Sequence, residues 1–435
     1  MNDYTDGTST TNGSSAQPLP IVIAGGGCVG LFLALLLSTS KPSIPNKVIV
    51  IEPESPDPTS TRAMAHQPPT YPILSKVPGL LPELIAKGSL SGGLCFRTSV
   101  ANGSRVIAGK TFDNASGEGM KGKGQLLLPQ GKFQEVLLQR LHLLPENGEV
   151  RLGSRVTSFA QSAESVIVQV QTPTGSTESI EAAYLIGADG AHSTIHKHLS
   201  IPFDGETLDV QLVATDIRFD FHAHGFLDAN FVIDPIDYGL IGRIESRKST
   251  QPALWRVSYG VPVSMSEDTI RAGVNEKLRK ILPNEGNSEN REKAFEVVRV
   301  APYKAQQRCA ETFWMGRVGL VGDAAHLTNP YAGLGLASGI ADASSLSEVL
   351  AHILNNEASN EAKLLASWSE ARRQKFTQVV DKPSRMAYAR VMSDVSTPDK
   401  VESLLSRDPL VSALKEGMPM MPPSLETKGL ELAGW

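Results

Sequence analysis

The pattern of apolar and polar positions changes along the chain, and the first clear pattern lies near the start. A short apolar run, residues 19–24, is followed by three glycines and a longer apolar run, residues 28–37. A second short run, residues 47–52, follows two prolines. Short apolar runs bounded by glycine or proline are typical of buried strands, and the longer run is typical of a buried helix. The pattern therefore predicts a βαβ unit with parallel strands.

The middle of the chain combines helical spacing with strict alternation. Apolar residues at helical intervals predict a helix in residues 131–144, and the charged residues 267–295 are also expected to be helical. Residues 165–172, SVIVQVQT, alternate apolar and polar positions, and residues 209–263 are rich in such stretches, so both are expected in antiparallel sheet. Residues 178–193 are expected to form one strand that ends in a glycine turn.

A further buried strand is expected in residues 316–326 and a long helix in residues 333–354, so a β-rich insertion separates two parts of one sheet. The predicted fold class is α/β, with a Rossmann-like nucleotide-binding domain, an inserted β-sheet substrate domain and a C-terminal helical segment. The expected divisions are a disordered tail (1–18), the discontinuous nucleotide-binding domain (19–204 and 301–375), the substrate domain (205–300), and C-terminal helices and tail (376–435). Residues 70–125 are expected to contribute in part to the substrate site.

Composition narrows the class of partner. Of the 435 residues, 41% are hydrophobic and 20% are charged, and the net charge of −5 provides no basic field for nucleic acid or an anionic lipid surface. A small-molecule ligand is expected instead. Three scattered cysteines favour a reducing compartment such as the cytoplasm over a disulfide framework or a zinc site. We expect no membrane segment, because no apolar run approaches ~20 residues, and the polar N-terminus does not resemble a signal peptide.

The first glycine cluster has the spacing of a dinucleotide-binding turn. Gly25, Gly27 and Gly30 form G-x-G-x-x-G between the first expected strand and helix. In this motif the glycines make the tight turn, let a pyrophosphate approach the backbone, and let helix and strand pack closely. Glu52 ends the next expected strand, where a carboxylate accepts a hydrogen bond from an adenosine ribose. An acidic residue there favours FAD or NAD over NADP at this turn.

Two further glycine-aspartate pairs follow expected buried strands. These are Asp189 with Gly190, and Gly322 with Asp323. A carboxylate at the end of a buried strand needs a partner, so each aspartate is either a helix or turn cap or a ligand contact. Together with the first turn, they are hard to explain for a protein that binds only a nicotinamide dinucleotide. They suit FAD, whose ribityl chain carries hydroxyls of its own.

The segments GGGCVG, GADGAHS and VGDAAHLTNPYAGLGLASGIADA, in this order, resemble the class A, single-component FAD-dependent monooxygenases, of which p-hydroxybenzoate hydroxylase is the type member. The resemblance covers most of residues 20–375. It implies an FAD-binding domain, a β-sheet substrate domain, and NAD(P)H used as co-substrate without a second Rossmann domain. In agreement, no second G-x-G-x-x-G follows an expected strand.

The resemblance implies roles for individual positions. Glu52 would bind the adenosine ribose, Arg62 would lie near the pyrophosphate and ribityl chain, and Gln130 would lie beside the flavin. Pro330 would lie at the edge of the flavin ring, with the start of the following helix facing its pyrimidine. The full set of expected FAD-binding residues is Gly25, Gly27, Cys28, Val29, Gly30, Glu52, Arg62, Gln130, Asp189, Gly322, Asp323, Gly333, Gly335, Leu336 and Ala337.

The resemblance also implies a reaction. NAD(P)H reduces the flavin, O2 adds to give a C4a-hydroperoxide, and one oxygen atom hydroxylates or epoxidises a small aromatic or polyketide-like molecule, as in secondary metabolism. Two departures keep an alternative open. Ala337 stands where many members have Asn, and His196 stands where they have Arg. The alternative is a flavin-binding isomerase or cyclase whose FAD is redox-silent.

Candidate catalytic residues are Pro330, Tyr331, His222 and Arg243. Tyr331 follows the expected flavin-edge proline, and packing against the helix start is an equal alternative for it. His222 and His224 are two apart on an expected strand, so they would face one side, either toward substrate or as structural residues. Tyr238, Arg243, Trp255 and Arg256 belong to the substrate sheet, and alternation allows about half of them to line a pocket.

The remaining candidates are expected to be structural. His196 and His198 are expected on a helix surface, His326 is expected to support its turn, and Cys28 is expected to pack. No metal site is expected, and the protein is expected to be a monomer or a homodimer. The C-terminal tail would cover the flavin domain or a partner subunit.

Overall fold

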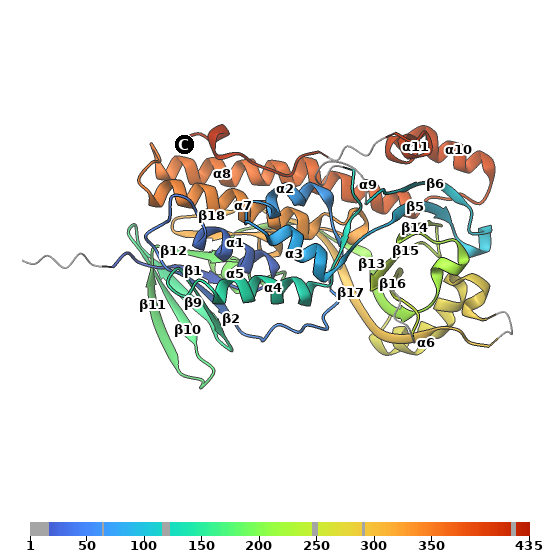
Figure 1. Cartoon of the computed structure of the whole chain (residues 1–435), viewed down its shortest axis with the longest axis horizontal. Coiled ribbons are helices and arrows are strands. Elements are labelled where there is room, and N and C mark those ends of the chain that lie inside the picture. Colours follow the sequence, from blue (N-terminus) through green and yellow to red (C-terminus); the bar gives the residue numbers. More distant parts are fainter. Residues whose placement is uncertain (1–16, 63–64, 115–121, 246–250, 289–291, 419–422) are drawn as a thin grey trace, which may run out of the picture.

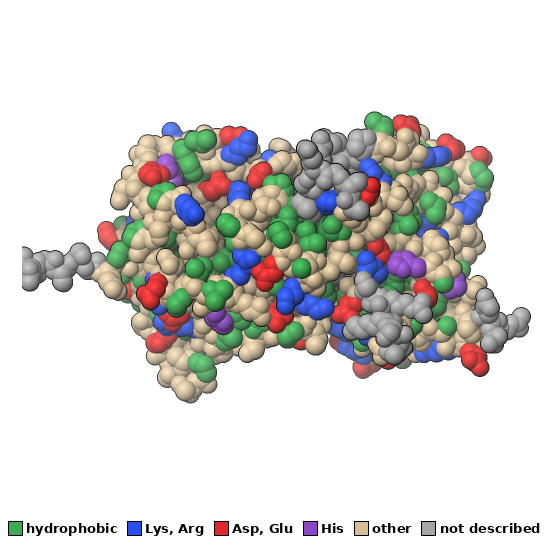
Figure 2. Space-filling model, viewed as in Figure 1, with side chains coloured by type: hydrophobic (Ala, Val, Ile, Leu, Met, Phe, Trp, Pro, Cys, Tyr) green, Lys and Arg blue, Asp and Glu red, His purple; other side chains and the backbone are tan. Residues whose placement is uncertain are grey.

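The structure, a computed structural model, describes residues 17–62, 65–114, 122–245, 251–288, 292–418 and 423–435. Two large sheets lie at opposite ends of the molecule (Figure 1). The first is six-stranded, in the order β18-β19-β12-β1-β2-β8, and the second is eight-stranded, in the order β20-β17-β13-β16-β15-β14-β5-β6. On the face in Figure 2, acidic and basic side chains are interspersed, as the small net charge leads one to expect.

The six-stranded sheet is the expected nucleotide-binding sheet. Its strands are β1 (Ile21–Ala24), β2 (Val48–Glu52), β8 (Gly148–Leu152), β12 (Tyr184–Gly187), β18 (Trp314–Met315) and β19 (Val318–Leu320). All neighbours except β18 and β19 pair in parallel. The expected helices are also present: α1 (Cys28–Ser38), α4 (Gln130–His142) and α7 (Gly335–Leu354). The predicted βαβ unit and Rossmann-like sheet are therefore confirmed.

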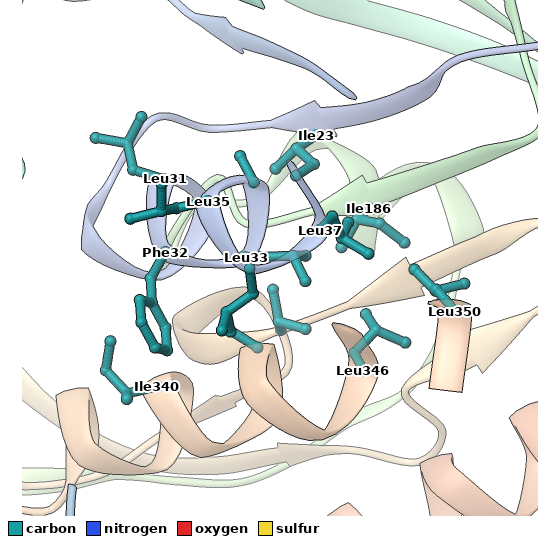
Figure 3. Close-up of a cluster of buried hydrophobic side chains, with 14 of the residues drawn as sticks. Ile23, Leu31, Phe32, Leu33, Leu35, Leu37, Ile186, Ile340, Leu346 and Leu350 are labelled. Carbon is teal, nitrogen blue, oxygen red and sulfur yellow. The ribbon is translucent and has the colours of Figure 1, made fainter. Parts of the chain in front are cut away.

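Helix α1 is the centre of the main core. Leu31, Phe32 and Leu33 are almost completely buried; Phe32 and Leu33 point toward helix α7, and Leu31 points away from it (Figure 3). A helix that is apolar on all sides is stable only when it is covered on all sides. Each buried leucine or phenylalanine contributes about 1.5–3 kcal/mol of transfer free energy. This packing fixes the start of α1 against the end of β1.

The eight-stranded sheet is the expected substrate sheet, and it is mostly antiparallel, with one parallel pair, β14 and β5. Its strands are β5 (Gly93–Thr98), β6 (Val106–Thr111), β13 (Phe203–Arg218), β14 (Ala229–Ile233), β15 (Gly239–Glu245), β16 (Leu254–Pro262), β17 (Glu296–Ala310) and β20 (His326–Leu327). One face, which includes Trp255, Val257 and Tyr259, packs against helix α6 (Glu267–Ile281). The opposite face, which includes Leu212 and Tyr238, packs against Tyr331.

Smaller elements complete the chain. They are the sheet of β3 (Ala65–His66), β4 (Ser89–Leu90) and β7 (Leu126–Leu127); the sheet of β9 (Arg155–Gln161), β10 (Val166–Gln171) and β11 (Thr177–Ala182); helices α2 (Tyr71–Leu74), α3 (Leu80–Lys87) and α5 (Thr194–Leu199); and short helical turns.

Three sequence predictions were wrong in detail. Residues 178–193 form two strands, β11 and β12, which belong to different sheets. The helix expected in residues 267–295 ends at Ile281, because Leu282 precedes a proline and adopts an extended conformation. His222 and His224 lie in a 3₁₀ turn, Phe221–His224, rather than on a strand. The domain boundaries stay predictions; in the structure, positions 205 and 300 lie inside β13 and β17, and β5 and β6 belong to the same sheet as these strands.

The C-terminal part is helical, as predicted. Helices α8 (Glu361–Lys375) and α9 (Lys382–Val391) are joined by a π-helical stretch, Phe376–Asp381, and α10 (Pro398–Arg407) and α11 (Pro409–Lys415) follow. Helices α10 and α11 cover β5 and β6, whereas the tail packs through Leu425 and Leu432 on the core of the six-stranded sheet (Figure 1). Within the described ranges, no helix is long and apolar enough to cross a membrane.

Candidate active site

The expected cofactor residues meet at one edge of the six-stranded sheet. Because β2, β1, β12 and β19 are parallel neighbours, their carboxyl ends lie side by side. Glu52, Gly25, Asp189 and Gly322 are at or just beyond these ends. The chain moves from β1 to β2 and β8 on one side, then returns to β12 and β19 on the other. A crevice at such a reversal of strand order is where open α/β sheets bind dinucleotides.

The three glycines of the first turn have different reasons to be glycine. Gly25 has φ +109°, and a Cβ there would overlap the carbonyl oxygen of Ala188. A Cβ on Gly30 would overlap the carbonyl oxygen of Gly25. By contrast, a Cβ on Gly27 would meet no described atom within 4 Å. Gly27 is also the N-cap of α1 and has no side-chain cap, so open space lies in front of free backbone N–H groups. This arrangement fits a pyrophosphate.

Glu52 holds the turn from the next strand. The backbone N–H of Gly26 donates to Glu52 Oε2 at 2.5 Å, and that of Glu54 donates to Oε1 at 2.9 Å. The carboxylate is half-buried beside the open face of the turn. Its remaining acceptor capacity fits the ribose contact expected for an adenine dinucleotide.

Asp189 and Asp323 differ in a way that the sequence left open. Asp189 Oδ2 accepts from the backbone N–H of Thr194 at 2.7 Å, so it caps the start of α5. Asp323 makes no hydrogen bond with any described residue. Its side chain is exposed, yet burial raises the pKa of its carboxyl. Asp323 is therefore an acceptor that lacks a partner among the described residues, which fits a ribityl hydroxyl.

The first turns of helix α7 pack against the turn that carries Gly322 and Asp323. Residues Pro330–Ala332 form a 3₁₀ turn, Gly333 has φ +65°, and α7 begins at Gly335 with no side-chain cap. The first N–H groups of α7, including that of Ala337, are thus available to an anionic group. A Cβ on Gly339 would lie 2.6 Å from Val29 Cγ2, so α1 and α7 cross closely here.

Beyond Pro330 lies a group of tyrosines from four separate parts of the chain. Tyr331 stacks on Tyr388 of α9, with ring centroids 5.6 Å apart and 27° between the planes. Its ring centroid is 6.0 Å from that of Tyr238. Tyr303 of β17 is 41% exposed, burial raises its pKa to about 12, and it is near enough to Tyr331 to contribute, after burial, to the raised pKa of that residue. We name Tyr238, Tyr303, Tyr331 and Tyr388 the tyrosine cluster.

Two hydroxyl groups of the tyrosine cluster are buried without partners. Tyr331 Oη has no hydrogen-bond partner among the described residues. Tyr238 Oη points toward Tyr388, which contributes with burial to its raised pKa, but the two do not meet hydrogen-bond geometry. A Cβ on Gly260 of β16 would overlap Tyr238 Oη, so the glycine makes room for it. Unpaired buried hydroxyls mark a place where a ligand completes the hydrogen bonding.

Residues 19–383 match the model of a protein family described as FAD binding domain. The chain is 36% identical to para-nitrophenol 4-monooxygenase of Pseudomonas sp. (strain WBC-3), over 82% of this chain and 83% of the relative.

The chain belongs to this family of FAD-dependent monooxygenases.

Two further comparisons agree. The monooxygenase is 33% identical to 6-hydroxy-3-succinoylpyridine 3-monooxygenase HspB of Pseudomonas putida (strain DSM 28022 / S16), over 83% of this chain and 86% of the relative. The crystal structure of p-nitrophenol 4-monooxygenase PnpA from Pseudomonas putida DLL-E4 matches it with a TM-score of 0.79 at 31% identity, covering 92% of this chain and 96% of that one. FAD is therefore its cofactor and NAD(P)H its co-substrate. The isomerase or cyclase alternative receives no support.

The structure places the other candidate residues of the monooxygenase outside the tyrosine cluster. Arg243 pairs with Trp255 across the two strands, so its side chain projects from the same face of the sheet as Trp255, the face that packs on α6. It is buried in an ion pair with Asp228, Nε to Oδ1 at 2.5 Å, and this pairing outweighs burial in lowering the pKa of Asp228. His222 Nε2 donates to Oδ1 of the same Asp228 carboxylate at 3.0 Å, and the His222 side chain is 52% exposed. Their catalytic roles stay predictions.

The four residues that were expected to be structural can also be placed. His196 is buried rather than on a helix surface, with Nδ1 2.9 Å from the carbonyl oxygen of Ala324 and Nε2 3.0 Å from that of Ile201. His198 is exposed. Cys28 is buried with a raised thiol pKa, which fits packing rather than redox chemistry. His326 is also buried and pairs with Asp342. In the described part of the chain, no group of acidic, histidine or cysteine side chains could hold a metal.

Several residues near the cofactor edge were not predicted. Gln67 lies against Gly333, where a Cβ would overlap its Nε2, and Gln125 Nε2 donates to Gln67 Oε1 at 3.1 Å. Gln134 Nε2 donates to the carbonyl oxygen of Gly26 at 3.1 Å. Tyr388 joins the tyrosine cluster from α9. The polar side of α4 contained Gln134 as a signal, but no local pattern marks Gln67 or Tyr388.

Proposed function

We propose that this monooxygenase hydroxylates a small phenol-like aromatic molecule bound against the tyrosine cluster. The observation that carries the proposal is the pair of buried, unpartnered hydroxyls of Tyr238 and Tyr331 beside Pro330. Burial of an unpaired hydroxyl costs about 1–3 kcal/mol, and a ligand that carries a hydroxyl or phenolate recovers this by hydrogen bonding. Aromatic walls favour a flat ring. The names of the two relatives also denote a nitrophenol and a hydroxypyridine as substrates.

Bound FAD, once reduced by NAD(P)H, would supply the oxygen activation. The protein's own contribution is binding, orientation and exclusion of water. Leu212, Ala305, Ala387 and Val391 surround the tyrosine cluster with apolar surface, which supports a dry site. The free N–H groups at the start of α7 would stabilise negative charge on a reduced ring, and Tyr331 would hold the substrate at the ring edge near Pro330.

The cofactor contacts of individual residues are part of the proposal. The open space at Gly27, the acceptor oxygens of Glu52 and the partnerless carboxylate of Asp323 support FAD binding in an extended form along the sheet edge. Arg62 is exposed on a loop whose neighbour Thr61 is held by Asp216, and Gln130 lies at the start of α4. Both positions are compatible with their expected roles.

We also propose a reducing location such as the cytoplasm, and action as a monomer or homodimer. The three cysteines are free, which supports the first.

The FAD-loaded enzyme tests the proposed function through oxidation of NADH and NADPH, followed at 340 nm, with a panel of ring compounds. Phenols and hydroxypyridines should accelerate the oxidation about 10-fold or more, while their methyl ethers, which cannot donate the hydrogen bond, should not. A phenol with fused rings, of the polyketide type, tests the largest substrate that the site accepts. Equal stimulation by phenols and their methyl ethers would contradict a site built on the tyrosine hydroxyls.

A further inference from the structure

Behind the flavin edge lies a buried group of charged side chains to which the proposed function assigns no role. Asp342 of α7 is completely buried, and its Oδ1 accepts from Arg372 Nε at 2.8 Å. Its Oδ2 lies 2.7 Å from His326 Nε2. Burial acts to raise the pKa of Asp342, but His326 and Arg372 lower it to about 2, so the group is ionised. Burying such charges is costly, and apolar packing would serve a helix crossing equally well.

Asp342 reaches the turn that carries Asp323. The backbone N–H of Gly322 donates to Asp342 Oδ2 at 3.1 Å. Gly322 has φ +61°, so this hydrogen bond fixes the N–H of a residue in a left-handed conformation, one position before the partnerless carboxylate. His326, three residues after Asp323, is held by the same Oδ2 and stacks on Phe376. Both ends of the Gly322–His326 segment are thus tied to one carboxylate.

Arg372 connects the same carboxylate to the C-terminal tail. Its Nη1 donates to the carbonyl oxygen of Leu425 at 2.7 Å and to Thr427 Oγ1 at 3.0 Å. Its Nη2 donates to the carbonyl oxygen of Ser338, in the first turn of α7, at 3.4 Å. The arginine therefore donates at once to acceptors on α7 and on the tail. If the tail were absent, Nη1 would lose two buried acceptors and the position of Arg372 against Asp342 would be less fixed.

We propose that Asp342 is a positioning residue for FAD, and that Leu425 and Thr427 of the C-terminal tail are part of the same device through Arg372. Asp342 fixes the position of the Gly322–Asp323 turn, so that Asp323 can accept a hydrogen bond from the ribityl chain. The tail in turn fixes Arg372 against Asp342. The strength of a hydrogen bond decreases steeply with misalignment, so a small shift of the turn is sufficient to weaken the binding of the cofactor. The device concerns FAD alone and is independent of the substrate class.

The test compares FAD affinity with folding in a set of variants. Asp342→Asn should raise the dissociation constant of FAD at least about 10-fold, as loss of a supporting residue does at metal sites. Thr427→Val, which removes only the hydroxyl, should raise it about 3-fold to 10-fold. Thr427→Ser keeps the hydroxyl and should restore the wild-type value. FAD affinity is measured by fluorescence titration of the apoprotein.

A matched control is available in the Arg390–Asp408 pair. It is a buried Arg–Asp pair of the same kind, Nε to Oδ2 at 2.5 Å, but it joins α9 to α11 rather than the flavin turn. Asp408→Asn should lower the melting temperature and leave the FAD dissociation constant unchanged. Amide hydrogen exchange of residues 322–326 in the apoprotein gives a readout that does not depend on the cofactor. It should be faster in Asp342→Asn and Thr427→Val than in Asp408→Asn.

The proposal is overturned if Thr427→Val and Asp342→Asn behave like Asp408→Asn, with lower melting temperatures but unchanged FAD affinity and exchange. The group would then be a packing feature only. If Asp342→Asn does not fold, the Thr427→Val and Thr427→Ser pair decides alone. Because no substrate is present in these measurements, their failure leaves the proposed hydroxylation untouched, and failure of the phenol panel leaves this proposal untouched.

Discussion

On the side of the six-stranded sheet, one carboxylate and the first N–H groups of α7 are left without partners among the described residues, whereas on the side of the eight-stranded sheet an arginine and an aspartate are paired with each other. Asp323 has no described partner, and the first turn of α7 has no side-chain cap. Across the site, Arg256 is bound to Asp216, and on the other face of the same sheet Arg243 is bound to Asp228. The buried groups beside Pro330 that lack a described partner are the neutral hydroxyls of Tyr238 and Tyr331.

This difference indicates what each side meets. A partnerless carboxylate and free helix N–H groups suit a ligand with hydroxyls, phosphates and a ring that becomes negative on reduction. Paired charges and free phenolic hydroxyls suit a neutral or weakly acidic aromatic ring. Substitutions on either side of the site test this difference.

The largest effect is expected in the first glycine turn. Gly30→Val should prevent formation of the holoenzyme, because its Cβ would overlap the carbonyl oxygen of Gly25 and drive α1 from β1. Gly27→Ala is the matched variant, since its Cβ meets no described atom. It should fold as wild type, by melting temperature, and lose FAD affinity at least about 10-fold. Wild-type FAD binding by Gly27→Ala would show that no pyrophosphate approaches this turn.

Arg243→Met should destabilise the protein by about 3–5 kcal/mol, because Asp228 would remain buried without its cation. His222→Ala should cost less than about 1 kcal/mol, since its side chain is half exposed. Urea unfolding measures both. In the folded fraction, kcat and KM should stay within about 3-fold of wild type. A large rise in KM at unchanged stability would restore Arg243 as a substrate-binding residue.

Asp323→Asn should weaken the binding of FAD but should not lower the stability of the apoprotein. The dissociation constant of FAD should rise about 10-fold, because a charged acceptor is lost. The pKa of Asp323 is raised in the folded protein, so the carboxyl stabilises the fold below its unfolded pKa, and this is lost as pH rises through the folded pKa. Ionised Asp323 therefore destabilises the apoprotein at pH 7.

Replacement by Asn should then leave the melting temperature of the apoprotein unchanged or higher at pH 7, with the difference vanishing toward pH 3. A lower melting temperature of the apoprotein at pH 7 would mean that Asp323 has a structural partner.

The smallest effect is expected for single hydroxyls of the tyrosine cluster. Tyr331→Phe should raise KM for a phenol about 3-fold to 10-fold, the value of one hydrogen bond, and leave FAD affinity unchanged. Because the hydroxyl has no described partner, the melting temperature of the apoprotein should not fall. A fall in stability without a change in KM would indicate that Tyr331 only packs against the start of α7.

The comparison also explains how much of the molecule could be predicted. Gly25, Gly30 and Gly322 are constrained by their own backbone or by a neighbouring element, so local sequence was sufficient to predict these tight turns. On the substrate side, the roles depend on which face of a strand a residue occupies and on elements far along the chain. Tyr388 comes from α9, and nothing near Tyr331 indicates it.

Arg243 illustrates the same limit. Strand alternation allowed half of the substrate-sheet candidates to reach a pocket, but it did not say which half. Trp255 and Arg256 are adjacent and therefore face opposite sides, and only the observed register assigns Arg243 to the side of Trp255. The 3₁₀ turn at His222 was missed because two histidines two residues apart fit a strand equally well.

The most direct test of the central claim, oxygen transfer to a phenol at this site, is a reaction of the FAD-loaded enzyme with NAD(P)H and a phenol under ¹⁸O₂, analysed by mass spectrometry. Each turnover should place one ¹⁸O atom in the ring product. The Tyr331→Phe variant should give less labelled product per NAD(P)H oxidised. A product that carries no ¹⁸O, formed while NAD(P)H is consumed, would contradict it.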